Sequence, residues 1–481
     1  MISITNYENL QLTPSQNFIS KNNTFLDENL PINILIKNLN DIKGSEINFS
    51  ELKEELSRKD QLGNPFYYLS LKEDDDLCII YYNNVPNNNT TRDKSIEALE
   101  SSCRSLILDK LTLKPLVTQY NKILYNADSL DFLKDKSWSQ IVVQKCYEGT
   151  LIMIFFHNNK WYVTTRRCLN AQESTWIRNK SYYDMFIEAM EGKFTFEELN
   201  KNYCYHFVLI HHKNKNIVSY NWLGREYKEL FHILTTEKYL LDEINCKIND
   251  KVSYVAKEKF DTMDDLLKEL NKQNDLDKTY QKITSEGYIL RYYTGEIYKS
   301  PFITLKLQTS IYDTLMKLKP NNSNIYQCFL ELYQKDKLNE FLPFFTRYGN
   351  EVIKRIHISI KNLSKETLDL YHLTRNKNNN EIYNNLTEQY KKCLYEIHGI
   401  YIKNRKQDFE NGIDNKKLGS TRSINVFDIY HYLKNMPANE LRQLYFDRMN
   451  ISINDKFKFI NRNCIDTMTQ STLMFKNYKK K

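Results

Sequence analysis

A lysine, a glutamate and a glycine stand close together between two apolar segments. Lys145, Glu148 and Gly149 follow residues 141–144 and precede residues 150–156. A lysine can attack a phosphate as a covalent nucleophile only when it is neutral, and burial or neighbouring cations lower its pKa. The two apolar segments predict strands joined by a tight hairpin turn at Gly149. An exposed hairpin with a solvated Lys and Glu is the competing interpretation.

Length and composition indicate a globular protein with more than one domain. The 481 residues suffice for two or three domains, and a hydrophobic fraction of 41% argues against global disorder. The nine cysteines are scattered and include no Cys-x-x-Cys pair, so they indicate neither a zinc site nor a disulfide framework. With no signal peptide recognised, they predict an intracellular, cytoplasmic setting. No apolar run is long enough to span a bilayer, and we expect no membrane partner.

The C-terminal third holds the basic excess of the chain. Residues 321–481 carry 27 Lys and Arg against 17 Asp and Glu, a net of +10, whereas residues 1–320 carry 41 and 43, a net of −2. Apolar residues recur at helical spacing in four segments of this region: 325–333, 352–360, 381–397 and 427–449. We therefore expect an all-helical basic domain that contacts RNA, with tRNA as one candidate. A solvated surface produced by lysine-rich composition is the alternative.

Cations stand at strand ends or in short connections earlier in the chain. Arg104 begins the apolar segment 104–109, Lys122 precedes 123–126, and Arg166 and Arg167 end the segment 160–167. Each alone would be an ordinary surface cation. Arginines suit phosphate contacts because their planar guanidinium groups bind two oxygens at once.

Two later segments add a carboxylate and further polar groups. Glu286 and Gly287 open an apolar segment that ends near residue 291, and residues 302–308 alternate apolar and polar side chains. The alternation predicts a strand with Lys306 and Gln308 on one face.

The order of these pieces resembles the covalent nucleotidyltransferase superfamily, and within it the bacteriophage RNA ligase 1 family. The matching segments cover about residues 65–315: 103–109, the Lys122 segment, 145–151, 164–167, 207–218, 286–290 and 306–312. The resemblance implies an α+β nucleotidyltransferase fold, an ATP-grasp-like ligase fold of antiparallel sheets, with a separate all-helical C-terminal domain. We expect an N-terminal extension (1–64), a nucleotidyltransferase domain (65–320) and a basic helical domain (321–481).

The resemblance also implies roles for individual residues. Lys145 would attack the α-phosphate of ATP to form a lysyl-adenylate, and Lys306 would contact that phosphate as the second catalytic residue. Glu286 would help to hold Mg²⁺ or Mn²⁺. The residues that match nucleotide-binding positions are Arg104, Lys122, Glu148, Gly149, Arg166, Phe207 and Gln308.

The chain departs from the family pattern at three places. The family has Lys-x-Asp/Glu-Gly, but Lys145 is one residue further from Gly149, and Cys146 holds the nucleophile position. Residues three apart on a strand face opposite sides, so Lys145 would need a β-bulge to reach the site. Val208 replaces a usual glutamate, and Gln308 replaces the second of two lysines.

These patterns favour an ATP-dependent RNA ligase that joins RNA ends through a Lys145-adenylate, acting as a monomer. The alternative is a catalytically inactive ligase-like domain that binds RNA or nucleotide. A capping guanylyltransferase is less favoured, because residues 321–481 are expected to be helical rather than the short strands that usually follow the core of that family.

Overall fold

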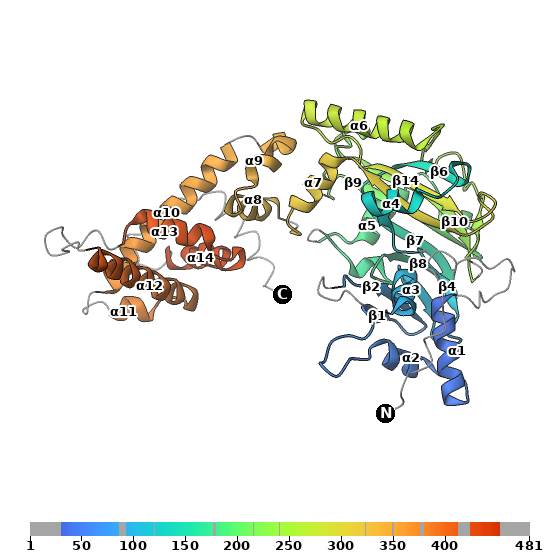
Figure 1. Ribbon diagram of the computed structural model, residues 1–481, viewed down its shortest axis with the longest axis horizontal. Coiled ribbons are helices and arrows are strands. Elements are labelled where there is room, and N and C mark those ends of the chain that lie inside the picture. The colour runs from blue at the N-terminus through green and yellow to red at the C-terminus, as the bar shows by residue number, and fades with distance from the viewer. Residues whose placement is uncertain are drawn as a thin grey trace. The chain divides into compact units, whose positions relative to one another are not determined.

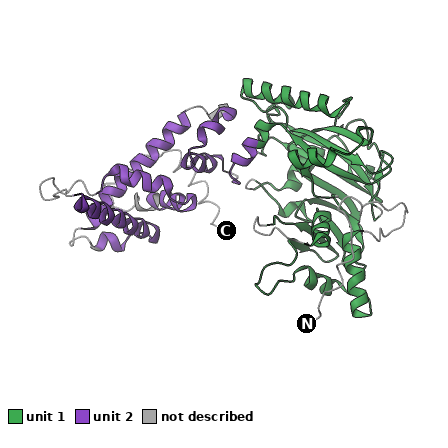
Figure 2. Cartoon of the chain, in the orientation of Figure 1, with its two compact units in different colours: residues 1–313 green, residues 314–481 purple. Residues whose placement is uncertain are grey.

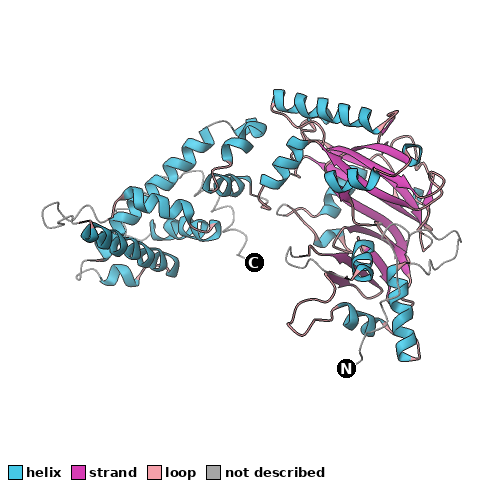
Figure 3. Cartoon of the chain, in the orientation of Figure 1, coloured by secondary structure: helices cyan, strands magenta, loops and turns pink. Residues whose placement is uncertain are grey.

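The computed structural model describes residues 30–85, 93–119, 121–176, 179–214, 216–239, 241–322, 324–348, 351–375, 380–411 and 424–452. The chain forms two compact units, Met1–Asp313 (unit 1) and Thr314–Lys481 (unit 2) (Figures 1 and 2). The described strands all belong to unit 1, and the described elements of unit 2 are helices (Figure 3). The predicted α+β fold, with antiparallel sheets and a helical C-terminal region, is confirmed.

The first sheet of unit 1 is antiparallel and is packed against the described N-terminal helices. Its strands, in the order β1-β2-β3-β4, are β1 Leu69–Glu73, β2 Leu77–Tyr82, β3 Leu106–Asp109 and β4 Pro115–Val117. The helices are α1 Pro31–Lys43, α2 Phe49–Leu56 and α3 Lys94–Ser102. Leu35, Leu52 and Leu99 from these helices join one buried cluster with the sheet. The described residues of the predicted N-terminal extension therefore belong to the core of unit 1.

The second sheet lies between the first sheet and helix α5 (Tyr182–Met190). Its order is β11-β10-β9-β7-β8, with β12 parallel to β10. The strands are β7 Thr150–His157, β8 Lys160–Thr165, β9 Tyr203–His211, β10 Lys228–Glu237, β11 Glu243–Ile244 and β12 Ser253–Tyr254. One face packs on Met185 and Phe186 of α5. The opposite face buries Phe155 against Ile79 of the first sheet.

The third sheet carries Lys145, Lys306 and Gln308 of the predicted site, and Glu286 lies immediately before one of its strands. Its order is β13-β6-β14-β15-β5, and its strands are β5 Leu124–Tyr125, β6 Ile141–Cys146, β13 Lys257–Glu258, β14 Gly287–Tyr293 and β15 Phe302–Gln308. Helices α4 (Asn126–Leu133) and α6 (Met263–Tyr280) cover one face (Figure 1). Leu266 and Leu270 of α6 pack there against Val143, Leu290 and Leu305. Each leucine buried in this way contributes about 1.5–3 kcal/mol.

A buried ion pair joins the third sheet to the second. Arg291 of β14 donates to Glu243 Oε1 of β11 at 3.1 Å and to the carbonyl oxygen of Ile233 at 3.1 Å. Tyr293 donates its hydroxyl hydrogen to Glu243 Oε2 at 2.7 Å. Because both carboxylate oxygens accept a hydrogen bond, this buried charge is compensated, and the pair fixes how the two sheets face one another.

The predicted hairpin at Gly149 is wrong. Strands β6 and β7 belong to different sheets: β6 pairs with β14 and β13, and β7 pairs with β8 and β9. Glu148 and Gly149 form the crossover between the sheets instead of a turn. Apolar runs on either side of a glycine predict two strands, but they do not reveal that each strand finds its partner elsewhere in the chain.

Unit 2 is built from packed helices. After α7 (Ser310–Leu318), which crosses the division between the units, its helices are α8 Ile325–Gln334, α9 Leu338–Phe341, α10 Glu351–Thr374, α11 Asn380–Asn384, α12 Glu388–Glu410, α13 Val426–Asn435 and α14 Ala438–Ser452. It also contains the short 3-10 segment Leu342–Tyr348, and unit 1 contains four others: Trp138–Gln140, Ala171–Glu173, Phe196–Glu198 and Asn221–Leu223. Arg448 of α14 forms a two-pronged ion pair with Glu366 of α10, at 2.6 and 2.8 Å. Helix α10 also packs on α13, and α12 packs on α14.

Candidate functional site

Side chains at the adjoining ends of β6, β14 and β15 share one face of the third sheet. Gly287 pairs with Cys146 on one side and with Gln308 on the other, and Ile289 lies beside Lys306. Side chains alternate along a strand, and residues directly opposite each other share a face. Cys146, Lys306 and Gln308 therefore face the same side, opposite to the face that α6 covers.

Gly287 permits the close approach of β14 and β15 at this point. Its φ is +137°, and a Cβ atom there would lie 2.1 Å from the carbonyl oxygen of Leu307. Glycine alone combines this backbone conformation with the absence of a side chain. The Glu-Gly pair of the sequence thus has a structural reason for its second residue.

The strand-end network consists of Asn126, Glu286, Lys306 and Gln308. Glu286 is 4% exposed, and its Oε1 accepts hydrogen bonds from Lys306 Nζ at 2.7 Å and Gln308 Nε2 at 2.9 Å. Asn126 Oδ1 accepts from the Gln308 amide at 2.9 Å, and Asn126 Nδ2 donates to Gln308 Oε1 at 3.2 Å. Burial acts to lower the pKa of Lys306, but the neighbouring Cys146 and the Glu286 carboxylate outweigh it and raise that pKa. Lys306 is therefore a charged side chain at neutral pH, and not a neutral nucleophile.

Cys146 occupies the family's nucleophile position as a buried thiol. It is 2% exposed. Burial raises the pKa of this thiol, and the nearby Glu286 carboxylate raises it further. Since the thiolate is the nucleophilic form of cysteine, Cys146 is unreactive at neutral pH.

Lys145 lies on the opposite face of the sheet. It pairs with Tyr288 in regular antiparallel register, and Tyr288 pairs with Leu307, which belongs to the core beneath α6. The register of β6 and β14 contains no bulge that would turn Lys145 toward Lys306. The structure therefore does not bring Lys145 together with Glu286 and Lys306. Its role as the nucleophile stays a prediction that this register does not support.

The Glu148–Gly149 crossover is held against β9 and the segment that follows it. Glu148 Oε2 accepts a hydrogen bond from the Val218 amide at 2.7 Å, and the Glu148 carbonyl accepts from the Tyr220 hydroxyl at 2.9 Å. A Cβ atom on Gly149 would lie 2.5 Å from Val208 Cγ1 and 2.6 Å from the Leu209 carbonyl oxygen. Gly149 is thus required by close packing rather than by a turn.

Phe207 lies away from this group of residues. It is fully buried in the cluster beneath α5, where its ring stacks on Phe194 at 5.4 Å between centroids. The structure therefore places this predicted nucleotide contact in the core. Strand alternation gives the reason, because its neighbour Val208 takes the other face of β9.

The arginine cluster consists of Arg104, Lys122, Arg166, Gln119 and Asn121. Arg166 and Lys122 both lie over the ring of Tyr82, at 4.5 and 5.9 Å from its centroid. The Ser105 hydroxyl donates to the Arg166 carbonyl at 2.6 Å. The Gln119 amide donates to the Arg104 carbonyl at 3.1 Å. The three predicted cations Arg104, Lys122 and Arg166 are thus brought to one place.

Several buried polar atoms of the arginine cluster have no hydrogen-bond partner among the described residues. These atoms are Arg104 Nε, Arg166 Nε, both amide atoms of Gln119, and Asn121 Oδ1. Burial and the neighbouring Arg166 lower the pKa of Arg104. Buried polar groups are almost always satisfied in native proteins. The donor nitrogens of Arg104, Arg166 and Gln119 suit an anionic ligand, whereas the amide oxygens of Gln119 and Asn121 need N–H or O–H donors.

Tyr125 connects the two groups. Lys306 Nζ lies 5.7 Å from the centroid of its ring, and Tyr125 is also within electrostatic reach of Arg104. The arginine cluster and the strand-end network therefore both neighbour Tyr125, and together they form the candidate site.

Sequence reasoning missed five members of this site: Gln119, Asn121, Asn126, Tyr220 and Tyr312. Burial raises the pKa of both tyrosines, and the Glu148 carboxylate raises it further, which places them beside that residue. Single amides and tyrosines in a chain rich in both residue types carry no motif. Only their positions in the folded chain identify them.

Glu286 offers one carboxylate oxygen to a divalent metal. Its Oε1 is taken by Lys306 and Gln308, which leaves Oε2 as the oxygen available to an ion. No group of three or more His, Cys, Asp and Glu side chains suited to a metal occurs in the described part of the chain. The residues thus fit the way Mg²⁺ often binds, through one carboxylate with substrate phosphates and water, and do not form a protein cage.

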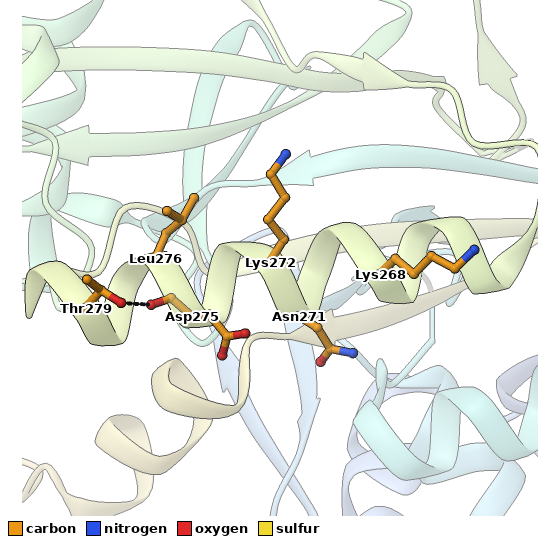
Figure 4. A pocket seen from close by; sticks show the side chains of 6 residues that line it. All are labelled: Lys268, Asn271, Lys272, Asp275, Leu276 and Thr279. Atoms are coloured by element: carbon orange, nitrogen blue, oxygen red, sulfur yellow. Dashed lines mark hydrogen bonds between the residues drawn. The ribbon is translucent and has the colours of Figure 1, made fainter.

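A furrow along α6 is separate from these residues. Lys268, Asn271, Lys272, Asp275, Leu276 and Thr279 line it, and all six come from that helix (Figure 4). Lys268 and Lys272 are ion-paired with Asp265 and Glu269 of the same helix. Because a single helix lines the furrow and its two lysines are already ion-paired, it is not the candidate site.

Among the described residues, no helix has the length and apolar character needed to cross a membrane. No family model matches the chain.

A curated relative is the immediate-early protein ICP-46 homolog of Invertebrate iridescent virus 3. It is 27% identical over 142 residues, which are 27% of this chain and 31% of the relative. The match therefore spans about a third of the relative's length.

The similar solved structures are ligases. Two forms of an archaeal ATP-dependent RNA ligase give TM-scores of 0.41 (form 2) and 0.37 (form 1) at 11% and 10% identity, covering 68% and 65% of this chain and 82% and 78% of the ligase. A putative ATP-dependent DNA ligase from Aquifex aeolicus gives a TM-score of 0.35 at 15% identity, covering 62% of this chain and 78% of the ligase.

Proposed function

We propose that unit 1 is a ligase-like nucleotidyltransferase domain that binds ATP without forming a covalent adduct. The observation that carries the proposal is the set of buried, unpartnered polar atoms around Arg104 and Arg166. A polyphosphate supplies several acceptor oxygens and the negative charge that this cluster lacks.

The contacts suggest a role for each part of the site. Arg104, Arg166, Lys122 and the Gln119 Nε2 atom would bind phosphate oxygens. The amide oxygens of Gln119 and Asn121 would accept from N–H or O–H groups of the nucleotide. Lys306, which also neighbours Tyr125, would contact the α-phosphate. Glu286 Oε2 would hold Mg²⁺ or Mn²⁺, which supplies charge neutralisation to the phosphates when bound. Glu148 would lie near the sugar while it fixes the following segment through the Val218 amide.

Two placements favour binding over adduct formation. In the family, a neutral lysine nitrogen bonds to the α-phosphorus and pyrophosphate leaves. Here the matching position holds Cys146, whose thiol stays protonated. Bringing Lys145 to that face would require a one-residue shift of β6, which would also move Val143 out of the core.

RNA is the proposed macromolecular partner, through the basic unit 2. The charge excess of residues 321–481 supports this part of the proposal. The chain is proposed to act as a monomer.

RNA end joining through a lysyl-adenylate is the second candidate function. It is favoured by the Lys306–Glu286 pair, because both residues stand where the family pattern expects them and lie 2.7 Å apart. It requires that β6 adopt the shifted register when nucleotide is bound.

A labelling experiment separates these candidates. The full chain would be incubated with α-labelled ATP or GTP and Mg²⁺ or Mn²⁺, and then examined for equilibrium binding and for label that survives a denaturing gel. We expect ATP binding without covalent label. Covalent label from ATP that disappears in Lys145→Ala would refute our proposal in favour of RNA ligase activity. Covalent label from GTP would indicate a capping enzyme. Absence of ATP binding would refute the proposal.

Cys146→Lys provides the matched gain-of-function variant. It restores a lysine three residues before Gly149, on the face that carries Lys306. We expect this variant to acquire covalent label where the parent protein has none. Cys146→Met, which adds similar bulk without an amine, is its control.

A further inference from the structure

We propose that the β9–β10 loop, residues 212–227, binds a single strand of nucleic acid beside the candidate site. Phosphates would contact its cations, and a base would stack on Trp222. This surface adjoins the proposed ATP site, but its binding of nucleic acid does not depend on ATP. The residues that carry the inference lie in the described parts of the loop, 212–214 and 216–227, and in the strand ends beside it.

The loop is fastened to both carboxylate-bearing segments of the candidate site. Asn216 Nδ2 donates to the Glu148 carbonyl at 3.1 Å, and the Val218 amide donates to the Glu148 carboxylate at 2.7 Å. The Ser219 amide donates to the carbonyl of Ile283 at 2.8 Å, three residues before Glu286. A ligand held by this loop would therefore lie next to Glu148 and Glu286.

Trp222 is the exposed aromatic group of the loop. Its side chain is 63% exposed in the short 3-10 segment Asn221–Leu223. Tyr220, two residues earlier, is buried and hydrogen-bonded to Glu148, so the backbone that presents Trp222 is fixed. An indole with a free face on a fixed backbone suits base stacking, which tolerates any base.

Lysines gather around one carboxylate at the base of the loop. Glu188 is ion-paired with Lys180 and with Lys228 at 3.7 Å, and it also hydrogen-bonds His211 at 3.1 Å. Lys213 lies close to Lys180, and this like charge lowers the pKa of Lys213. Three lysines thus lie near one carboxylate, and a phosphate would relieve their repulsion.

Two further features favour nucleic acid over a protein partner. Lys213 and Arg225 are exposed, and within the described residues neither is within ion-pair distance of a carboxylate. The exposed large hydrophobic side chain of the described loop is Trp222 alone. A protein interface would need a broader apolar centre, whereas alternating stacking and phosphate contacts need only these groups.

Binding of labelled single strands to the full chain tests the proposal. The probes would be an RNA and a DNA of the same mixed sequence, roughly 12 nucleotides long, within the usual site sizes of such proteins. Fluorescence anisotropy would be recorded over a series of salt concentrations. We expect Trp222→Ala to weaken binding by about 5- to 100-fold, and Trp222→Phe to retain most of the affinity because it keeps an aromatic face.

Charge reversals test the phosphate contacts separately. For Lys213→Glu and Arg225→Glu, we expect the slope of log K against log salt concentration to become shallower by about 0.7 for each phosphate that the variant no longer binds. Lys272→Glu, on the exposed face of α6, is the charge control. It should bind like the parent protein.

ATP binding distinguishes failure of this proposal from failure of the proposed function. Trp222→Ala should bind ATP normally. If the loop variants bind RNA and DNA with unchanged affinity and slope, the proposal is overturned even where ATP binds. It is also overturned if Trp222→Ala loses ATP binding in parallel, since the loop would then only support the nucleotide site. A change in self-association without a change in nucleic-acid binding would assign Trp222 to a protein contact instead.

Discussion

The strand-end network and the arginine cluster both neighbour Tyr125, but their buried polar atoms differ in whether they have hydrogen-bond partners. In the strand-end network, Lys306 and Gln308 both donate to Glu286, and Asn126 donates to the side-chain oxygen of Gln308. In the arginine cluster, buried nitrogens of Arg104 and Arg166 have no partner among the described residues.

Because of this difference, we expect the strand-end network to affect mainly folding stability and the arginine cluster to affect mainly ligand binding. A buried network whose hydrogen bonds are all made stabilises the folded chain, and removing one partner leaves a charge that the interior cannot solvate. An unsaturated cluster costs stability while empty and recovers it when a ligand arrives. Substitutions in the two regions should therefore move different measurements.

The largest effect is expected from Glu286→Ala. It leaves the Lys306 ammonium buried without its carboxylate, so we expect the free energy of unfolding to fall by about 3–5 kcal/mol. Denaturant titration with far-UV circular dichroism measures this change. Glu286→Gln combined with Lys306→Met removes both charges and should recover much of the loss. A double variant as unstable as Glu286→Ala would show that the charge is not the reason.

Arg104→Ala should weaken ATP binding by about 10- to 100-fold, as expected for hydrogen bonds to a charged ligand. The free energy of unfolding without ligand should stay the same or rise, because a buried Nε that has no partner among the described residues is removed. Isothermal titration calorimetry and a thermal melt give the two values. Arg167→Ala, at an exposed neighbouring arginine, is the matched control. Equal loss of binding in both variants would argue against a specific site.

We expect acid to destabilise the second sheet of unit 1 through two buried histidines, and to leave the arginine cluster unchanged. Burial lowers the pKa of His206 and His232 to about 3. The unfolded chain takes up these protons near pH 6.5 and the folded chain does not, so stability is present above pH 6.5 and is lost as pH falls. The expected slope is about 1.4 kcal/mol per pH unit for each histidine. Denaturation at several pH values, with His206→Gln as comparison, measures it; an unchanged slope in that variant would contradict the assignment.

The smallest effect is expected from Lys145→Ala. Its side chain is half-buried on the face opposite to Lys306, so ATP binding should change by less than about twofold and stability by less than about 0.5 kcal/mol. Side-by-side titrations of Lys145→Ala and Lys306→Met provide the comparison. A strong loss of ATP binding in Lys145→Ala would show that β6 shifts its register when nucleotide is present.

The sequence alone predicted the elements of the site better than their pairing. Alternation in residues 302–308 correctly placed Lys306 and Gln308 on one face of β15, because that pattern is local. The apolar runs around Gly149 also predicted two strands. Their assignment to different sheets depends on β14 and β9, which are distant in sequence, and no local pattern contains that information.

The sequence also could not predict which buried side-chain amides would have hydrogen-bond partners. Gln119 and Asn121 are ordinary residues until burial leaves their amide atoms without hydrogen bonds. Phe207 shows the reverse case, since its match to a family position did not reveal that β9 turns it into the core. The residue types of the site and their order along the chain could thus be predicted from the sequence. Which buried polar atoms have hydrogen-bond partners could be seen only in the folded structure.

Helix α7 has a practical consequence for dissecting the protein. It begins two residues after Gln308, continues through the division after Asp313, and carries Tyr312, buried near Glu148, in its first turn. A fragment cut at that division would keep Tyr312 but lose the rest of the helix that holds it, and so short a helix remnant would fray. Separate expression of unit 1 should therefore extend at least through Leu318, the last residue of α7.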